Sequence, residues 1–327
     1  MAKKYDHPPP ERLSRHTLRL AVTDRCNLRC AYCMPAGGAS WTAARRLPSL
    51  ERMSELVTWL GRLYRLEKLR ITGGEPTLRR GLPELIRLFA TAPEVPQVAM
   101  TTNGTRLARL AGELAAAGLD RVNVSLDTLD PTRYTELTRG GNVEDAVEGI
   151  RAAAKARLDP IRLNSVLRRS SWRSDVPALL DFALEHGVEP RFLELMRTGT
   201  ERAWSEVEFV PATEIQRWLD WNGGLQFTGI ASHGTARRSR VLWRGSEITV
   251  GWITPVSDPF CDSCNRLRLD AKGRLRRCLM DPQTLPLLDL LEKGDDSSVQ
   301  RQVEEYLGAK VAPMGMHNRL PMVSLGG

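Results

Sequence analysis

The feature that most constrains the fold is a regular alternation of short β-type runs with helical patterns over residues 18–196. Six β-type runs occupy residues 18–25, 68–74, 97–104, 121–127, 161–168 and 190–196. Apolar residues at helical spacing lie between them, at 49–65, 82–91, 105–117, 131–138 with 143–156, and 175–187. Strands that alternate with helices form a parallel sheet with right-handed crossovers. Six units are too few for a closed TIM barrel, so the pattern predicts an open barrel or a doubly wound sheet.

Polar residues near the carboxyl ends of these runs favour the barrel. Every run has them, namely Thr23, Asp24 and Arg25; Gly73, Gly74 and Glu75; Thr101, Thr102 and Asn103; Ser125 and Asp127; Asn164; and Glu194 and Met196. In α/β barrels this rim carries the active site. We therefore expect an α/β fold, a partial TIM-type barrel of six units, with one shared site in its mouth.

Composition limits the class of protein. The 327 residues are enough for a large core, and no stretch has the apolar length needed to cross a bilayer. The N-terminal MAKKYDHPPP lacks an apolar run behind its lysines, so we expect no signal peptide and a cytoplasmic location. The net charge of +8 favours anionic partners, although on charge alone a solvated basic surface is the simpler interpretation.

The alternation of strands and helices ends after residue 197. One further helix is expected at 212–221, and short β-type runs, VLWR and ITVGWIT, follow from residue 241. We therefore expect two units, with the barrel in residues 1–240 and a C-terminal region that carries a second cysteine group in residues 241–327.

Three cysteines, Cys26, Cys30 and Cys33, lie within VTDRCNLRCAYCMP, at the end of the first β-type run. Disulfides are disfavoured between thiols this close in sequence in a reducing compartment, which leaves structural thiols, half a zinc site or iron–sulfur ligands. Zinc favours paired C-x2-C knuckles with a fourth ligand, whereas three thiolates on one loop suit a [4Fe–4S] cluster with one iron left open. Such an iron can bind and polarise a substrate.

A second group contains Cys261, Cys264 and Cys278. Its C-x2-C pair is followed by one more cysteine farther along the chain. Taken alone, this spacing predicts a zinc site completed by a histidine, either His233 or His317.

The C-x3-C-x2-C spacing, with Tyr32 before the last cysteine, resembles the radical S-adenosylmethionine (SAM) superfamily. In that family SAM binds the open iron, and an electron from the cluster cleaves SAM to methionine and a 5′-deoxyadenosyl radical. The GGEP segment at 73–76 resembles the motif that holds the methionine end of SAM. The resemblance implies a six-unit partial barrel and a SAM site that includes Tyr32, Gly73, Gly74, Glu75, Ser125, Asn164 and Met196.

Within that superfamily, PVSDPFCDSCNRLRLDAKGRLRRCL and the terminal Gly326-Gly327 are similar to the GTP 3′,8-cyclase family of molybdenum cofactor biosynthesis. The resemblance implies a second [4Fe–4S] cluster on Cys261, Cys264 and Cys278, and a glycine tail that reaches into the active site. It also implies cyclisation of GTP to a product that cyclic pyranopterin monophosphate synthase rearranges. The positions that match GTP contacts are Arg19, Arg70, Thr101, Arg162, Arg191, Arg266 and Arg268.

For two of these positions, Arg70 and Arg162, the chemistry of arginine also bears on the prediction. Arg70 lies between Leu69 and Ile71 in a β-type run, and an arginine that faces a barrel interior needs an anionic partner. Arg162 stands where the family usually has lysine, which keeps the charge but changes the geometry of a phosphate contact.

Two other functions stay open. One is a radical SAM enzyme with an auxiliary cluster that acts on another substrate, such as a peptide. The other is a basic nucleic-acid-binding protein with zinc or a cluster, but its charge is dispersed rather than gathered in one stripe. For the cyclase we expect a flavodoxin or ferredoxin as electron donor and neither a membrane nor a nucleic-acid partner, and the resemblance allows a homodimer.

Overall fold

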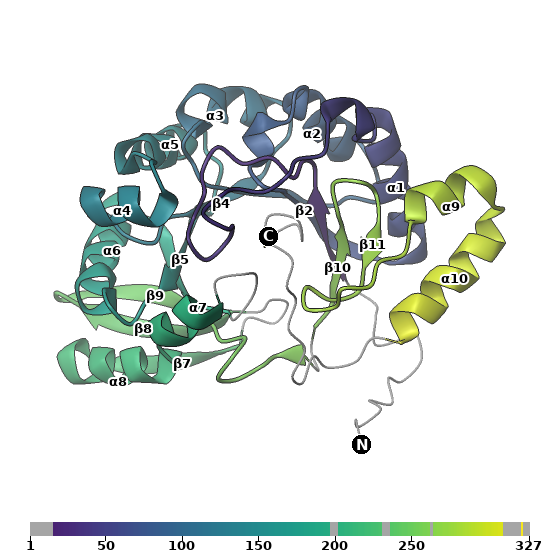
Figure 1. The fold of residues 1–327 in the computed structure, drawn as a ribbon. Helices are drawn as coiled ribbons and strands as arrows, with labels where there is room; N and C mark the ends of the chain where they lie inside the picture. Colours follow the sequence, from purple (N-terminus) through teal and green to yellow (C-terminus); the bar gives the residue numbers. More distant parts are fainter. Residues whose placement is uncertain (1–15, 197–201, 231–235, 262–263, 310–321, 323–327) are drawn as a thin grey trace, which may run out of the picture.

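The computed structural model describes residues 16–196, 202–230, 236–261, 264–309 and 322. In these residues the strands form one sheet, in the order β11-β10-β1-β2-β3-β4-β5-β6-β9-β8-β7. The six central strands are parallel: β1 (His16–Ala21), β2 (Leu66–Thr72), β3 (Val98–Thr102), β4 (Arg121–Ser125), β5 (Arg162–Leu167) and β6 (Glu189–Glu194). The sheet curves into an open barrel (Figure 1), which confirms the predicted partial barrel.

Helices cover the outer face of the six central strands (Figure 1): α1 (Leu50–Leu63), α2 (Leu82–Ala90), α3 (Leu107–Ala116), α4 (Pro131–Thr138), α5 (Val143–Lys155) and α6 (Trp172–His186). Side chains alternate between this face and the barrel interior. In β2, Leu69 and Ile71 are fully buried in the core under the helices. Arg70, which lies between them, therefore faces the barrel interior.

Local signals place the helices close to their predicted positions. The Ser49 side chain accepts a hydrogen bond from the Arg52 N–H at the start of α1, and Asp130 caps α4 ahead of Pro131. Gly187 ends α6 in the left-handed conformation, with φ of 64°. No helix in the described ranges is both long enough and apolar enough to span a membrane.

The chain after residue 224 extends the sheet at both edges, and the sequence did not predict this. At one edge β9 (Ser246–Ile253) pairs in parallel with β6, and β8 (Arg237–Trp243) and β7 (Leu225–Ile230) continue antiparallel. At the other edge β10 (Arg266–Leu269) pairs in parallel with β1, and β11 (Leu275–Arg276) follows antiparallel. The remaining helices are α7 (Arg202–Glu208), α8 (Ala212–Gly223), α9 (Leu287–Lys293) and α10 (Asp296–Gly308).

These pairings bear on the predicted division at residues 240 and 241. That position lies inside β8, and the strands on both sides of it belong to the same sheet. The division into two units stays a prediction, whereas the sheet itself runs across it.

Candidate active site

The first cysteine group lies on the loop after β1, and its three thiols are half-buried. Burial raises the pKa of Cys30 well above its usual range, and the nearby charges of Cys33, Asp127 and Cys26 raise it further. Burial likewise raises the pKa of Cys26 to about 11. The charges of the three thiols therefore act on one another, which places them close together. Bound iron would stabilise their thiolate forms, so the three residues fit an iron–sulfur cluster.

Backbone contacts with α4 fix this loop. The Ala31 N–H donates to the Leu137 carbonyl at 2.9 Å. The Arg139 guanidinium donates to the Met34 carbonyl at 2.8 Å, directly after the last cysteine. The cysteine loop is therefore held from both sides of Cys33 by the carboxyl end of one helix.

The Gly-Gly-Glu turn after β2 lies against the same loop. The Gly74 N–H donates to the Thr23 carbonyl at 2.8 Å, and the Glu75 N–H donates to the Arg25 carbonyl at 2.7 Å. A Cβ atom at Gly73 would lie 2.4 Å from the Thr23 oxygen, and one at Gly74 would lie 2.2 Å from the Arg25 oxygen. Only residues without a Cβ allow two backbones to approach this closely.

The Glu75 carboxylate is fully buried and already holds several donors. It accepts hydrogen bonds from the backbone and hydroxyl of Thr77, from the Thr102 hydroxyl and from the Asn103 N–H, at 2.7–3.1 Å. These bonds join the loop after β2 to the loop after β3. The structure thus gives Glu75 a supporting role, and its direct contact with SAM stays a prediction.

Tyr32 links the cysteine loop to the rim of the barrel. Its hydroxyl donates to Asp127 Oδ2 at 2.7 Å, and Asp127 Oδ1 accepts from the Val166 N–H, also at 2.7 Å. Burial raises the pKa of Asp127 to about 6, although both hydrogen bonds oppose that shift. Asp127 follows β4 and Val166 lies near the end of β5, so three parts of the rim meet at one carboxyl group.

The other predicted SAM residues also lie at strand ends. Ser125 and Asn164 are directly opposite each other in the β4–β5 ladder. Asn164 Oδ1 is buried, and no described residue donates to it. Half-buried Met196 follows β6. Glu194, by contrast, accepts from the backbone N–H groups of Ala212, Val256 and Ser257 and so anchors the chain before the second cysteine group.

Arginines line the barrel interior. Arg19 of β1 lies opposite Arg268 of β10 on one side and Arg70 of β2 on the other. Burial, followed by the charges of neighbouring arginines, lowers the pKa of both Arg19 and Arg70 to about 9. Arg70 donates to the Thr101 hydroxyl at 3.3 Å, and Arg19 Nε and Arg268 Nη1 are buried without a hydrogen-bond partner in the described part of the chain. Buried guanidinium groups that lack hydrogen-bond partners favour the binding of an anion.

Arg162 and Arg191 gather around Glu189, at the opposite end of β6 from the rim. Glu189 binds Arg162 at 3.2 Å, Arg191 at 2.6 Å and Arg238 at 3.3 Å. Burial opposes ionisation of Glu189, but Arg191 and Arg162 outweigh it and lower the pKa. The Arg191 side chain packs over Gly251, where a Cβ atom would lie 2.9 Å from it. The carboxylate of Glu189 therefore already binds the arginines of this part of the site in the free protein.

The sequence interpretation missed three basic residues of this interior: Lys68, Arg121 and Arg238. Lys68 and Arg121 were detectable, because each is separated by one residue from a polar side chain on the same face of its strand, Arg70 and Asn123 respectively. Arg238 lies opposite Gly251 in the β8–β9 ladder. Its place in the barrel depends on the pairing of β9 with β6, which the sequence did not predict.

The second cysteine group adjoins the arginines of β10. Arg266 Nε donates to Cys264 Sγ at 3.4 Å, and the charges of Cys264 and Cys278 act on Arg268. In the described residues no three His, Cys, Asp or Glu side chains come together as they would around a single metal ion. The three cysteines are half-buried, the Cys264 N–H donates to the Cys261 carbonyl at 3.1 Å, and arginines lie nearby to offset thiolate charge, so Cys261, Cys264 and Cys278 fit a [4Fe–4S] cluster.

Met322 contacts the first cysteine group. The Met322 N–H donates to the Cys33 carbonyl at 3.0 Å. Gly326 and Gly327, predicted to enter the active site, and His233 and His317, considered as zinc ligands, lie outside the described residues.

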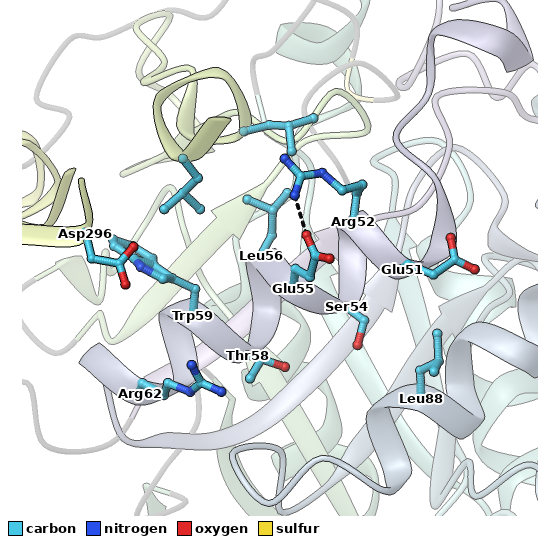
Figure 2. A pocket seen from close by; sticks show the side chains of 12 residues that line it. Glu51, Arg52, Ser54, Glu55, Leu56, Thr58, Trp59, Arg62, Leu88 and Asp296 are labelled. Atoms are coloured by element: carbon cyan, nitrogen blue, oxygen red, sulfur yellow. Dashed lines mark hydrogen bonds and ion pairs between the residues drawn. The ribbon is translucent and has the colours of Figure 1, made fainter. Parts of the chain in front are cut away.

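A separate pocket of about 440 Å³ lies on the outer side of the barrel, between α1 and the C-terminal helices (Figure 2). Its lining includes Arg52, Glu55, Trp59 and Asp296, and Arg52 bridges Glu55 and Glu292. The predicted site residues do not contribute to this lining, so the pocket is distinct from the barrel interior.

Comparison with known proteins agrees with this arrangement. Residues 20–183 match the radical SAM superfamily, and residues 188–315 match Molybdenum Cofactor Synthesis C. The chain is 42% identical over 279 residues to the GTP 3′,8-cyclase of Pelotomaculum thermopropionicum, which covers 85% of each chain. It is 38% identical over 317 residues to that of Streptomyces coelicolor, covering 95% of this chain and 93% of the relative. The chain belongs to the GTP 3′,8-cyclase family of radical SAM proteins.

Solved structures show the same fold at much lower identity. Streptococcus suis SuiB bound to S-adenosylmethionine has a TM-score of 0.61 and 13% identity, over 85% of this chain. SuiB bound to its precursor peptide SuiA has the same TM-score and 14% identity. This chain spans about 65% of the length of SuiB, so the likeness places this GTP 3′,8-cyclase family member in the radical SAM fold and no further.

We expect Asp127→Asn to weaken SAM binding about 10-fold, because a hydrogen bond to a charged group contributes about 1.5–3 kcal/mol. Tyr32 would lose its charged acceptor while the cysteines stay intact. The measurement is the Kd for SAM on the anaerobically reconstituted protein, together with its iron content. Asp145→Asn, on the exposed side of α5, is the matched control. Unchanged SAM affinity in Asp127→Asn would refute the assigned role.

Proposed function

We propose that this chain cyclises GTP to (8S)-3′,8-cyclo-7,8-dihydroguanosine 5′-triphosphate, the first step of molybdenum cofactor biosynthesis. The observation that carries the proposal is the row of arginines inside the barrel, Arg268, Arg19 and Arg70 on neighbouring strands, in which Arg19 Nε and Arg268 Nη1 have no hydrogen-bond partner among the described residues. A triphosphate carries about four negative charges, and guanidinium groups pair with phosphate oxygens in a bidentate manner. The names of the relatives, which share most of the chain, support the same substrate.

One end of the barrel would bind SAM, and the other would bind the substrate. Cys26, Cys30 and Cys33 would hold one [4Fe–4S] cluster, and the glycine turn, Tyr32, Ser125, Asn164 and Met196 would hold SAM beside it. When bound, this cluster and SAM supply the one-electron chemistry that starts a radical reaction at C3′ of the ribose. The remaining task of the protein is to fix the ribose at that place and to exclude water.

The other end would hold the substrate. Cys261, Cys264 and Cys278 would bind the second cluster close to the guanine, and Arg266 and Arg268 would orient the base beside it. Arg19, Arg70, Thr101, Arg162 and Arg191 would bind the phosphates. Because Arg162 and Arg191 already bind Glu189, phosphate oxygens would take over guanidinium donors that this carboxylate holds in the free protein.

The remaining partners follow from this function. The product would pass to cyclic pyranopterin monophosphate synthase, and a flavodoxin or ferredoxin would supply the electron. We also propose a cytoplasmic location, since reduced clusters need a reducing compartment, and a homodimer as the assembly to test.

An anaerobic turnover experiment tests the proposal. Reconstituted protein, SAM and a reductant are incubated with and without GTP, and the products are separated by chromatography. We expect 5′-deoxyadenosine and the cyclised nucleotide to increase together only when GTP is present. Because the product is an isomer of GTP, retention or its acid-derived pterin must be followed rather than mass alone. If 5′-deoxyadenosine forms while GTP is unchanged, the substrate is another molecule, and a peptide is the next to test.

A further inference from the structure

We infer that Arg121, the first residue of β4, is a further phosphate-binding residue of this site. The inference rests on the proposed GTP substrate and deepens it, because it adds one more contact for the phosphates beyond those that the sequence predicted. Arg121 belongs to neither cysteine group and to none of the predicted nucleotide contacts.

Arg121 is buried but incompletely paired. Its side chain is 4% exposed, and its Nε donates to Gln97 Oε1 at 3.2 Å. Its Nη1 is buried, and no described residue accepts from it. A guanidinium carries five N–H donors, and a buried charge without a partner is costly. An anion that enters the barrel would remove this cost.

The charges around Arg121 are mostly of its own sign. Burial lowers its pKa to about 10, and the charges of Arg162 and Arg191 contribute to the shift, partly offset by Glu189 and Asp120. Both carboxylates are already engaged, since Glu189 binds three arginines and Asp120 accepts from the Val98 N–H at 2.7 Å. Arg121 therefore differs from Arg162 and Arg191, whose guanidinium groups bind an acid within the protein.

The register places Arg121 between the two groups of predicted phosphate residues. Arg70 lies opposite Ala99, and Ala99 lies opposite Arg121, so all three face the barrel interior. The small Ala99 side chain separates the two guanidinium-bearing residues. Among the charged neighbours of Arg70, Arg121 has the largest effect on its pKa, ahead of Arg191 and Arg162. Arg121 thus connects Arg70 with the cluster around Glu189.

Depth in the barrel indicates which part of a nucleotide Arg121 meets. Ser125, a predicted SAM contact, ends β4, whereas Arg121 begins it. At about 3.3 Å per residue, Arg121 lies roughly 13 Å farther from the rim. The second cysteine group adjoins β10, and β1, β2 and β3 lie between β10 and β4 in the sheet. The basic neighbours of Arg121 are instead Arg70, Arg162 and Arg191, which are predicted phosphate contacts, so the phosphates are the part of the nucleotide that it would meet.

The test compares ligands that differ in phosphate number. Anaerobically reconstituted full-length protein with SAM is titrated with GTP, GDP, GMP and inorganic tripolyphosphate. We expect Arg121→Gln to weaken GTP binding about 10- to 100-fold, because a charge-assisted contact is lost. GMP binding should change less than about 3-fold, within the effect of an uncharged contact. Arg151→Gln, on the exposed side of α5 where Arg151 pairs with Glu144 and Glu148, is the control for net charge.

A second measurement separates binding from structure. Because Arg121 is repelled by its neighbours, Arg121→Gln should raise the melting temperature without nucleotide and reduce the stabilisation by GTP. If Arg121 had a purely structural role, its replacement would lower the melting temperature measured without nucleotide. Arg121→Lys keeps the charge without the planar fork, so it should weaken GTP binding by less than Arg121→Gln does. If Arg121→Gln fails to fold, Arg121→Lys is used in its place.

Three outcomes are decisive. Wild-type affinity for GTP in Arg121→Gln, or equal losses for GTP and GMP, would overturn the inference. A loss that grows from GMP to GTP supports it. If the wild type fails to bind GTP but binds tripolyphosphate through Arg121, the phosphate role stands and the proposed substrate falls.

Discussion

Replacing Cys30 by alanine should remove about half of the bound iron and all reductive cleavage of SAM, whereas Cys264→Ala should remove a similar amount of iron and leave that cleavage intact. The two losses differ because the thiols belong to separate groups. Cys30 lies on the loop that the Gly-Gly-Glu turn contacts, and Cys264 lies beside Arg266. Only the first group adjoins the residues predicted to hold SAM. The product of GTP cyclisation should be absent in both variants.

The measurements are iron and sulfide content, the electron paramagnetic resonance spectrum of the reduced protein, and the yield of 5′-deoxyadenosine. Each variant is the matched control of the other, since both remove one half-buried thiol. Full retention of SAM cleavage in Cys30→Ala would contradict the assignment of the first group. Loss of SAM cleavage in Cys264→Ala, with the first cluster still present, would show that the two groups do not work separately.

Gly74→Ala should destabilise the protein by about 3 kcal/mol, the upper end of the usual cost of overpacking, and abolish detectable SAM binding. The added Cβ would lie 2.2 Å from the Arg25 carbonyl oxygen and 2.7 Å from the Asp24 oxygen. Both are backbone atoms of the cysteine loop, so no side chain can rotate away to make room. The loop must move, and with it the hydrogen bond from Glu75 to Arg25. Melting temperature and SAM titration measure the two effects.

Gly37→Ala is the control for this substitution. Gly37 lies on the same connection between β1 and α1, and a Cβ there would meet nothing within 4 Å. It should bind SAM with the affinity of the wild type. If Gly74→Ala also bound SAM normally, the close approach of the two loops would have no functional importance.

Local features were readable from the sequence because they depend on residues near one another along the chain. The spacing of Cys26, Cys30 and Cys33 indicates one loop with three ligands, whatever surrounds it. The alternation of six β-type runs with helical patterns predicts a parallel sheet, since such runs must bury one face under helices. The same alternation places Arg70 on the face of its strand opposite Leu69 and Ile71, and the structure shows that this face is the barrel interior.

Other features depend on which strands are neighbours, and the tertiary structure decided these. Arg268 faces Arg19 only because β10 pairs with β1, hundreds of residues earlier in the chain. Arg238 reaches Glu189 because β9 pairs with β6 and β8 pairs with β9. No local pattern specifies these pairings, since a strand carries the same alternation at either edge of a sheet.

The sequence by itself determined the repeating units and which side chains share a face of a strand, and it predicted the cysteine ligands. It could not determine where a carboxylate is already occupied. Glu75 resembled a ligand, yet four hydrogen bonds from Thr77, Thr102 and Asn103 hold it inside the protein. The alternation could reveal the inward face of Arg121, but only the structure shows that it is buried without a full set of acceptors among the described residues. Whether a polar group is satisfied depends on neighbours distant in sequence, and only the folded chain brings those neighbours together.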